Sequence, residues 1–251
     1  MLRTNLFRAA FAAAVGAALF TATPAQAAVI FTFDNASDAQ PQSPTQAAGT
    51  WYTDRFAPAG FASGLVGGGR TGVLGLSIAA ADFQADPFLN TQGRKYDLAA
   101  GTLSMFVDMF VPATPVTGRF GGLWATGVNN TNAISAFPII EYNAGGFRTW
   151  NSGWTDITGF AGVDQWYQIG FTYSSGLLNY FINGQQVSSF AQGTTVSLSN
   201  VILQGYNAGA DKTIFFDNLT TSAVPEPASM AVFGILGLTA FGYRVRRKVR
   251  V

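Results

Sequence analysis

Residues 164–190, DQWYQIGFTYSSGLLNYFINGQQVSSF, indicate the fold class most clearly. This stretch holds three runs in which Ile, Phe, Tyr or Val alternate with other residues, separated by Ser174-Ser175-Gly176 and by Asn183-Gly184. Asn-Gly between two apolar runs is typical of a type I′ β-hairpin, and Ser and Gly are turn residues as well. The stretch therefore predicts three consecutive antiparallel strands, a β-meander.

The same pattern extends over residues 29–221, where short apolar runs such as VIFTF, TLSMFVDMFVP and SNVILQGYN are separated by Gly, Asn, Ser and Pro. In TLSMFVDMFVP every second residue from Leu103 to Val111 is apolar, and Phe106 and Phe110 lie on the other face. Such a strand belongs in a two-layer structure that covers part of its second face. About a dozen strands without a persistent helical period predict an all-β sandwich or jelly roll over residues 28–222.

Residues 164–190 resemble the laminin-G/concanavalin-like family. The resemblance rests on Trp166 at the start of its strand, on the alternation of Ile169, Phe171 and Tyr173, and on the segment YFING at residues 180–184. TIFFDNLTTS near the end of the domain resembles the strand that closes such domains. The resemblance implies two curved sheets, frequent glycan or calcium binding, and a core position for Trp166.

The N-terminal residues 1–27 have the three parts of a secretory signal peptide. Arg3 and Arg8 precede an apolar segment, residues 9–20, and Ala25-Gln26-Ala27 forms a small-residue cleavage site. An uncleaved anchor or a buried helix is the alternative. The shortness of the apolar segment favours export across the inner membrane and cleavage after Ala27 by signal peptidase.

The C-terminal residues 223–251 form a second targeting segment. Residues 228–243 carry no charge and predict a short transmembrane helix, and the basic tail 244–251 should stay cytoplasmic. The motif VPEPAS at residues 224–229, followed by the apolar stretch and the basic tail, resembles the PEP-CTERM sorting signal. The residues that match the motif itself are Val224, Pro225, Glu226 and Pro227.

This second resemblance implies a Gram-negative bacterium that secretes exopolysaccharide, and a membrane-embedded exosortase that cleaves near Pro-Glu-Pro. The protein is then expected at the cell surface or in the extracellular matrix, anchored to the membrane only transiently through the C-terminal helix. An ordinary tail anchor is the alternative.

Composition excludes several function classes. Residues 28–222 contain seven basic and twelve acidic residues, a net charge of −5, which argues against nucleic-acid binding. The chain has no Cys and no His, so Ser-His-Asp and Cys-His catalysis, His/Cys zinc sites and disulfides are excluded.

A glycosidase needs two carboxylates around the scissile bond. Glu141 is the single Glu of residues 28–222, and it is expected to be a strand-end carboxylate facing solvent. We therefore predict that the protein is not an enzyme. A glycoside-active enzyme that pairs Glu141 with Asp156 is the alternative.

A carbohydrate-binding site instead needs aromatic rings and a few polar side chains, and these gather in residues 141–156. The candidate ligand-binding residues are Tyr142, Arg148, Trp150, Asn151, Trp154 and Asp156. Trp51, Tyr52 and Trp124 are more distant candidates, although Trp in a sandwich is usually a core residue. Extracellular polysaccharide is the expected partner, and a passive structural surface protein is a further alternative.

The tripeptide Phe-Asp-Asn occurs at both ends of the domain and places Asp34 and Asp217 in the terminal strands, which often pair in sandwiches. Carboxylate oxygens suit Ca²⁺, so these residues are candidate ligands of a structural calcium ion. The alternative is that both are turn or strand-end residues. No other cofactor is expected.

Overall fold

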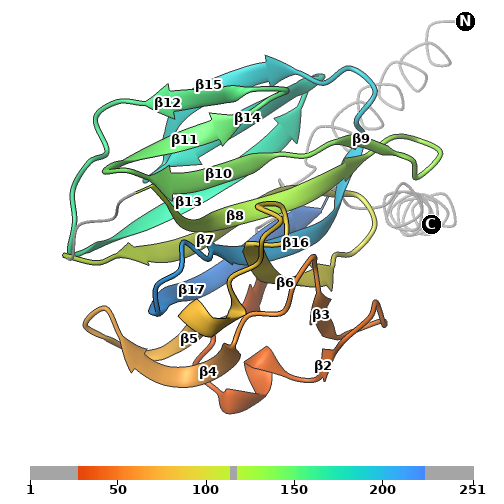
Figure 1. The fold of residues 1–251 in the computed structure, drawn as a ribbon. Coiled ribbons are helices and arrows are strands. Elements are labelled where there is room, and N and C mark those ends of the chain that lie inside the picture. Colours follow the sequence, from red (N-terminus) through yellow and green to blue (C-terminus); the bar gives the residue numbers. More distant parts are fainter. Residues whose placement is uncertain (1–27, 114–117, 224–251) are drawn as a thin grey trace, which may run out of the picture. The chain divides into compact units, whose positions relative to one another are not determined.

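The structure is a computed structural model that describes residues 28–113 and 118–223. In these ranges β-strands form two sheets, one of eight and one of nine strands, whose inner faces share one hydrophobic core (Figure 1). Two short 3-10 helices, Ala36–Ala39 and Ala80–Asp82, lie between strands. The predicted all-β sandwich is confirmed.

The strands of the eight-stranded sheet are β1 (Ala28–Phe31), β4 (Gly60–Gly67), β5 (Arg70–Ile78), β7 (Thr102–Val111), β13 (Gln165–Ser174), β14 (Leu177–Ile182), β15 (Gln185–Ala191) and β17 (Lys212–Ala223). The strands of the nine-stranded sheet are β2 (Gln42–Ser43), β3 (Trp51–Thr53), β6 (Thr91–Asp97), β8 (Arg119–Val128), β9 (Ile134–Ala136), β10 (Ile139–Asn143), β11 (Gly146–Trp150), β12 (Trp154–Ile157) and β16 (Ser197–Tyr206). The first sheet has the order β15-β14-β13-β7-β17-β5-β4 with β1 on β17, and the second has the order β12-β11-β10-β8-β16-β6-β3-β2 with β9 on β8.

The predicted meander is present as β13, β14 and β15, which pair antiparallel in sequence order. Asn183 and Gly184 at its second turn have φ angles of 50° and 76°, in the left-handed region that a type I′ turn requires. Ser175 and Gly176 at the first turn have φ angles of 53° and 77°. The turn residues therefore set the register of this part of the sheet.

β7 shows the predicted two-sided burial. Met105, Val107, Met109 and Val111 are fully buried in the core. On the outer face, Phe106 contacts Phe181 of β14 and Phe110 contacts Trp166 of β13, with ring centroids 5.9 and 5.5 Å apart. The second face of β7 is thus covered by aromatic side chains of its own sheet.

Trp166 lies on this outer face, and the prediction that it belongs to the core was wrong. The register places Trp166 opposite Phe110, while the next residue, Tyr167, points into the core. Because successive side chains of a strand point to opposite faces, the two residues cannot both be internal. The Trp166 Nε1 donates to the carbonyl oxygen of Gly68 at 2.7 Å.

The terminal strands of the domain pair, as expected. β1 runs antiparallel to β17, with Phe31 opposite Leu219. Trp51 is fully buried near this pair, and its ring centroid lies 5.2 Å from Phe31 and 5.0 Å from Phe61. Trp51 is therefore a core residue and does not belong to a ligand-binding surface.

Candidate ligand-binding site

Side chains on the outer face of the nine-stranded sheet form two parallel rows across the strands. The register places five residues of β12, β11, β10, β8 and β16 side by side in the first row. This charged row consists of Asp156, Arg148, Glu141, Gly122 and Gln204. Strands lie about 4.8 Å apart, so the row is about 19 Å long.

Glu141 lies at the centre of the charged row and is fully buried, although it was expected to face solvent. Its Oε1 accepts hydrogen bonds from Arg119 Nε at 3.0 Å and from Arg148 Nε at 2.8 Å. Its Oε2 accepts from Arg119 Nη2 at 3.0 Å and from Gln204 Nε2 at 3.3 Å. We call these four residues the Glu141 cluster. Two guanidinium groups compensate the cost of burying the carboxylate.

Gly122 provides the space for this arrangement. It lies directly opposite Glu141 on the neighbouring strand β8. A Cβ atom at this position would collide with the carbonyl oxygen of Ile140 and lie 2.8 Å from Glu141 Cβ. The absence of a side chain lets the Glu141 carboxylate lie across β8 towards Gln204.

The second row, which we call the tryptophan row, lies two residues along each strand. Its members are Trp154, Trp150, Ile139, Trp124 and Ile202. The Trp150 and Trp154 rings meet edge to face with centroids 5.2 Å apart. Trp154 is 37% exposed and supplies most of the open aromatic surface at this end.

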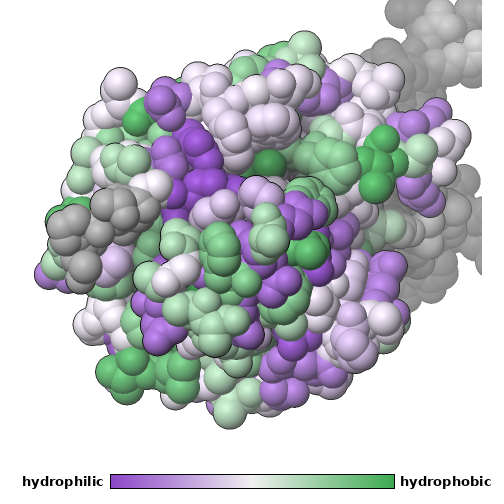
Figure 2. Space-filling view, in the orientation of Figure 1, coloured by the Kyte–Doolittle hydropathy of each residue, from purple (hydrophilic) through white to green (hydrophobic). Residues whose placement is uncertain are grey.

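Cations link the two rows. The Arg148 guanidinium lies 3.8 Å from the Trp154 ring centroid, and the Arg55 guanidinium lies 4.0 Å from that of Trp124. Arg119 covers Tyr206 at 4.3 Å. Cation–π contacts of this kind hold guanidinium groups in place and keep the rings flat against them. Figure 2 shows hydrophilic side chains gathered over β10, β11 and β12 on this face.

The structure brings four of the six predicted ligand-binding residues onto this face, namely Arg148, Trp150, Trp154 and Asp156. Asn151 lies at the end of β11, where its Oδ1 accepts from Gln192 Nε2 at 2.7 Å. Tyr142 is fully buried in the core against Phe147, because it alternates with the outward-facing Glu141. Burial raises the pKa of Tyr142. Tyr142 is therefore not available to a ligand.

A cavity of about 160 Å³ adjoins the tryptophan row. Its lining residues are Ser135, Ala136, Phe137, Trp150, Asn151, Ser152, Leu178 and Gln192.

Sequence reasoning missed Arg119, Gln204 and Tyr206, which complete the site from β8 and β16. These residues lie far from residues 141–156 in the sequence, and only the pairing of β8 with β10 and β16 brings them there. A usable signal existed for Glu141: its neighbour Tyr142 fits the core, so strict alternation places Glu141 on the opposite face.

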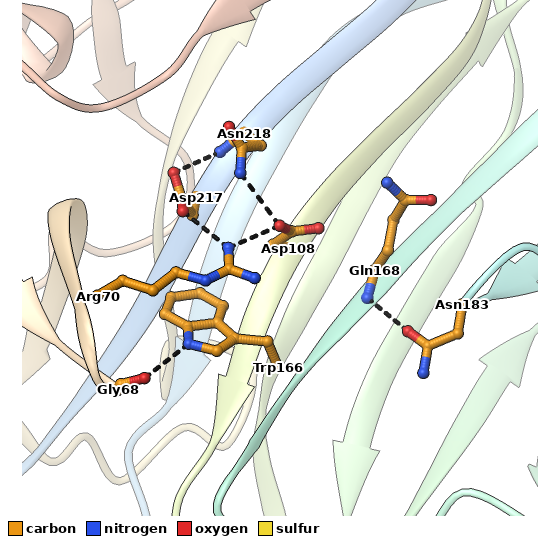
Figure 3. Close-up of polar contacts among 8 residues, drawn as sticks. All are labelled: Gly68, Arg70, Asp108, Trp166, Gln168, Asn183, Asp217 and Asn218. Carbon is orange, nitrogen blue, oxygen red and sulfur yellow. Dashed lines mark hydrogen bonds and ion pairs between the residues drawn. The ribbon is translucent and has the colours of Figure 1, made fainter.

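Asp217, one of the two candidate calcium ligands, pairs with a cation of the protein. Arg70 Nη1 lies 2.8 Å from Asp217 and 2.7 Å from Asp108, and its guanidinium covers the Trp166 ring at 4.1 Å (Figure 3). Burial raises the pKa of Asp217, and Arg70 acts in the opposite direction. Asp34 belongs to no such cluster: among residues 28–113 and 118–223, no group of three or more Asp or Glu residues could hold a metal ion. The predicted calcium site gains no support.

Three of the predictions fall outside the described residues: the signal peptide, residues 1–27, the motif residues Val224 to Pro227, and the transmembrane segment, residues 228–243. Among residues 28–113 and 118–223, the structure contains no helix that could span a membrane.

Comparison with known proteins confirms the sorting motif. Residues 223–248 match a family model described as the PEP-CTERM protein-sorting motif. The chain therefore carries this motif at its C-terminus, and the motif implies export, exosortase processing, and a surface or extracellular location. No match was found among the curated proteins.

Solved structures resemble the domain. One of them has a TM-score of 0.54 at 10% identity. Its description concerns endo-acting O-glycanases, which prominent members of the human gut microbiota express to initiate mucin breakdown. The alignment covers 79% of this chain and 100% of that one. SCLam, a non-specific endo-β-1,3(4)-glucanase from family GH16, has a TM-score of 0.51 at 10% identity, with 80% and 92% covered.

A sialidase aligns with a TM-score of 0.48 at 15% identity over 72% of this chain, which spans 17% of the sialidase. The two structures with TM-scores above 0.5 show that the domain has the fold of concanavalin-like jelly-roll glycanases. At 10% identity the likeness concerns the fold alone.

Proposed function

We propose that this protein is exported, released from its signal peptide by signal peptidase, sorted by an exosortase, and displayed at the cell surface or in the extracellular matrix. There its β-sandwich binds glycan without catalysis. The observation that carries the binding proposal is the tryptophan row beside the charged row on one face of the nine-stranded sheet. The C-terminal segment anchors the protein only before processing.

The chemistry of the two rows suits a sugar chain. The C–H faces of a pyranose ring stack on indole rings. The Trp154 indole is exposed for such stacking, and the Trp150 ring packs edge to face against it. Hydroxyl groups find charged partners one row away in Arg148 and Asp156. Both rows cross several strands, so the face offers contacts along an extended ligand rather than at one point.

The Glu141 cluster favours binding over hydrolysis. Both Glu141 oxygens already accept hydrogen bonds from guanidinium groups, so neither is placed to exchange a proton with a glycosidic oxygen. Arg148 stands between Glu141 and Asp156 in the charged row, where a hydrolase would place the scissile bond. The two similar structures are described as glycan-degrading enzymes, which supports a glycan as ligand and leaves the chemistry to this chain's own residues.

The test is binding of the domain, residues 28–223, to a panel of bacterial exopolysaccharides by affinity electrophoresis and calorimetry. This segment contains the complete core. We expect Trp154→Ala to weaken binding about tenfold or more, since an exposed stacking ring is lost. Leu177→Ala changes a similarly exposed apolar residue at the start of β14, in the other sheet; this variant is the control and should bind normally.

Each alternative function predicts a different result. Release of reducing sugar that disappears in Glu141→Gln would establish the glycoside-active alternative. Failure of every polysaccharide to bind would favour the passive structural protein. Equal loss of binding in Trp154→Ala and Leu177→Ala would move the binding site away from the tryptophan row.

A further inference from the structure

The cations of the domain are concentrated on the face that carries the two rows. Residues 28–222 have a net charge of −5, yet four of their seven basic side chains lie on this face, and Lys212 lies at its margin with Nζ 3.4 Å from the carbonyl oxygen of Arg119. The four on the face are Arg55, Lys95, Arg119 and Arg148. The remainder of the domain is therefore strongly acidic.

The Glu141 carboxylate does not cancel this charge at the surface. Its side chain is completely buried, whereas the side chains of Arg119 and Arg148 that cover it are 24% and 14% exposed. The local net charge is positive, because the three charges of Arg119, Arg148 and Lys212 exceed the one negative charge of Glu141 by two. Asp156, at the end of the charged row, reduces this net charge to one. A ligand at this point meets the guanidinium groups, while the carboxylate forms the floor beneath them.

Both guanidinium groups keep a donor for a ligand. Arg119 and Arg148 contact Glu141 through Nε and Nη2. Among the described residues, neither Nη1 donates to a protein group. A guanidinium group fixed by a buried carboxylate and by aromatic rings loses little further side-chain freedom when it binds an anion.

The combination of a cation and an indole occurs twice along the tryptophan row. Arg148 covers Trp154, and Arg55, which with Lys95 contacts Asp54, covers Trp124. Trp154 and Trp124 lie three strand spacings apart, about 14 Å. A ligand that contacts both units must span this distance, as a polysaccharide chain does.

We propose that the glycan bound on this face is an anionic polysaccharide, whose carboxylate or sulfate groups accept hydrogen bonds from Arg119 and Arg148 while its rings stack on Trp154. This inference rests on the proposed glycan-binding function and adds the charge of the ligand to it. The acidic remainder of the domain repels a polyanion, so the chain is directed to this face.

The experiment compares one polyuronate with its carboxyl-reduced, neutral form, which keeps the same sugar backbone. Binding of residues 28–223 to each is measured by calorimetry between 50 and 500 mM NaCl. We expect the acidic form to bind at least about tenfold more tightly at low salt, and its affinity to fall as salt increases. The affinity of the neutral form should not depend on salt.

Charge variants locate the effect. Lys212→Gln leaves all contacts of the Glu141 cluster in place and should weaken binding of the acidic polysaccharide a few-fold. Arg119→Gln should weaken the same binding about tenfold. Arg70→Gln removes the same charge from the outer face of the other sheet and should bind normally. Circular dichroism confirms that each variant is folded.

The outcomes separate the two proposals. Equal affinity for the acidic and the reduced form overturns the inference of an anionic ligand and supports glycan binding. Equal weakening by Arg70→Gln and Arg119→Gln overturns the location of the charge recognition. If neither form of the polyuronate binds and no member of the exopolysaccharide panel binds, the proposed binding function itself is overturned.

Discussion

Glu141 and Arg148 face each other across the paired strands β10 and β11, and the Arg148 guanidinium lies between the buried Glu141 carboxylate and the Trp154 ring. This one side chain joins the charged row to the tryptophan row. Arg148 thereby contacts the exposed indole on one side and the carboxylate on the other, so Glu141 helps to position the side chains of both rows.

Removal of the buried anion should destabilise the domain. Glu141→Ala leaves Arg119 and Arg148 without their shared partner, and we expect the free energy of unfolding to fall by about 3 kcal/mol. Glu141→Gln keeps the volume and part of the hydrogen bonding, so its loss should be smaller. Urea titration measures both. Asp156→Asn in the same row, which is exposed, should change stability by less than about 0.5 kcal/mol. An unchanged midpoint in Glu141→Ala would contradict the role of the cluster.

The close approach at Gly122 gives a second prediction. Gly122→Ala should cost about 2 kcal/mol or more, since the new Cβ collides with the backbone of β10. Gly153→Ala, where nothing lies within 4 Å of the added Cβ, is the matched control and should be nearly neutral. Thermal unfolding of both variants is the measurement. If both had the same melting temperature as the wild type, the packing of Glu141 across β8 would be wrong.

Lys212 should make stability depend on pH. Burial lowers the pKa of Lys212 to about 8, against about 10.5 for the unfolded chain. Between these values the unfolded state binds more protons, so the free energy of unfolding rises with pH, by at most about 1.4 kcal/mol per unit. Burial raises the pKa of Tyr52 and of Tyr180. Above about pH 10 these two side chains therefore make the free energy of unfolding fall as the pH rises.

Urea midpoints at pH 7.5, 8.5 and 9.5 test this window. The wild type should become more stable over the series, and Lys212→Met should be more stable at pH 7.5 and show a flatter profile. Arg94→Gln, which also removes a positive charge but lies in β6, between β16 and β3, is the control and should keep the wild-type slope. A flat wild-type profile would contradict the buried position of Lys212.

Arg70 holds two carboxylates together on the outer face of the eight-stranded sheet. Arg70→Gln leaves Asp108 and Asp217 facing each other without a cation, so it should destabilise the domain by about 1 kcal/mol at pH 7. Protonation of one carboxyl group relieves the repulsion, so the loss should be smaller at pH 4. Chemical denaturation at both pH values checks this. Asp217→Asn in the same background should restore stability at pH 7.

Much of the fold could be predicted because its signals are local. The Asn183-Gly184 turn and the alternation in β7 follow from residue types within a few positions of one another. The pairing of the terminal strands was expected for a different reason, namely that such strands often pair in sandwiches. The core position predicted for Trp166 was wrong, because alternation within β13 assigns that place to Tyr167.

The candidate site could be predicted only in part. The segment 141–156 contributes Arg148, Trp150, Trp154 and Asp156, which lie near one another in the sequence because β11 and β12 form a hairpin. Tyr142 points into the core and is not accessible to a ligand. Asp217, a predicted calcium ligand, pairs instead with the guanidinium group of Arg70, which lies 147 residues away in the sequence.

The sorting motif, the strand content and the turns could be read from the sequence, because each depends on short-range composition and backbone preference. Only the three-dimensional structure shows that Arg119 and Gln204 contact Glu141, that Arg119 covers Tyr206, and that the cations of an acidic domain gather on one face. Sheet register creates these relationships, since hydrogen bonding between distant strands places side chains in rows that no single segment contains.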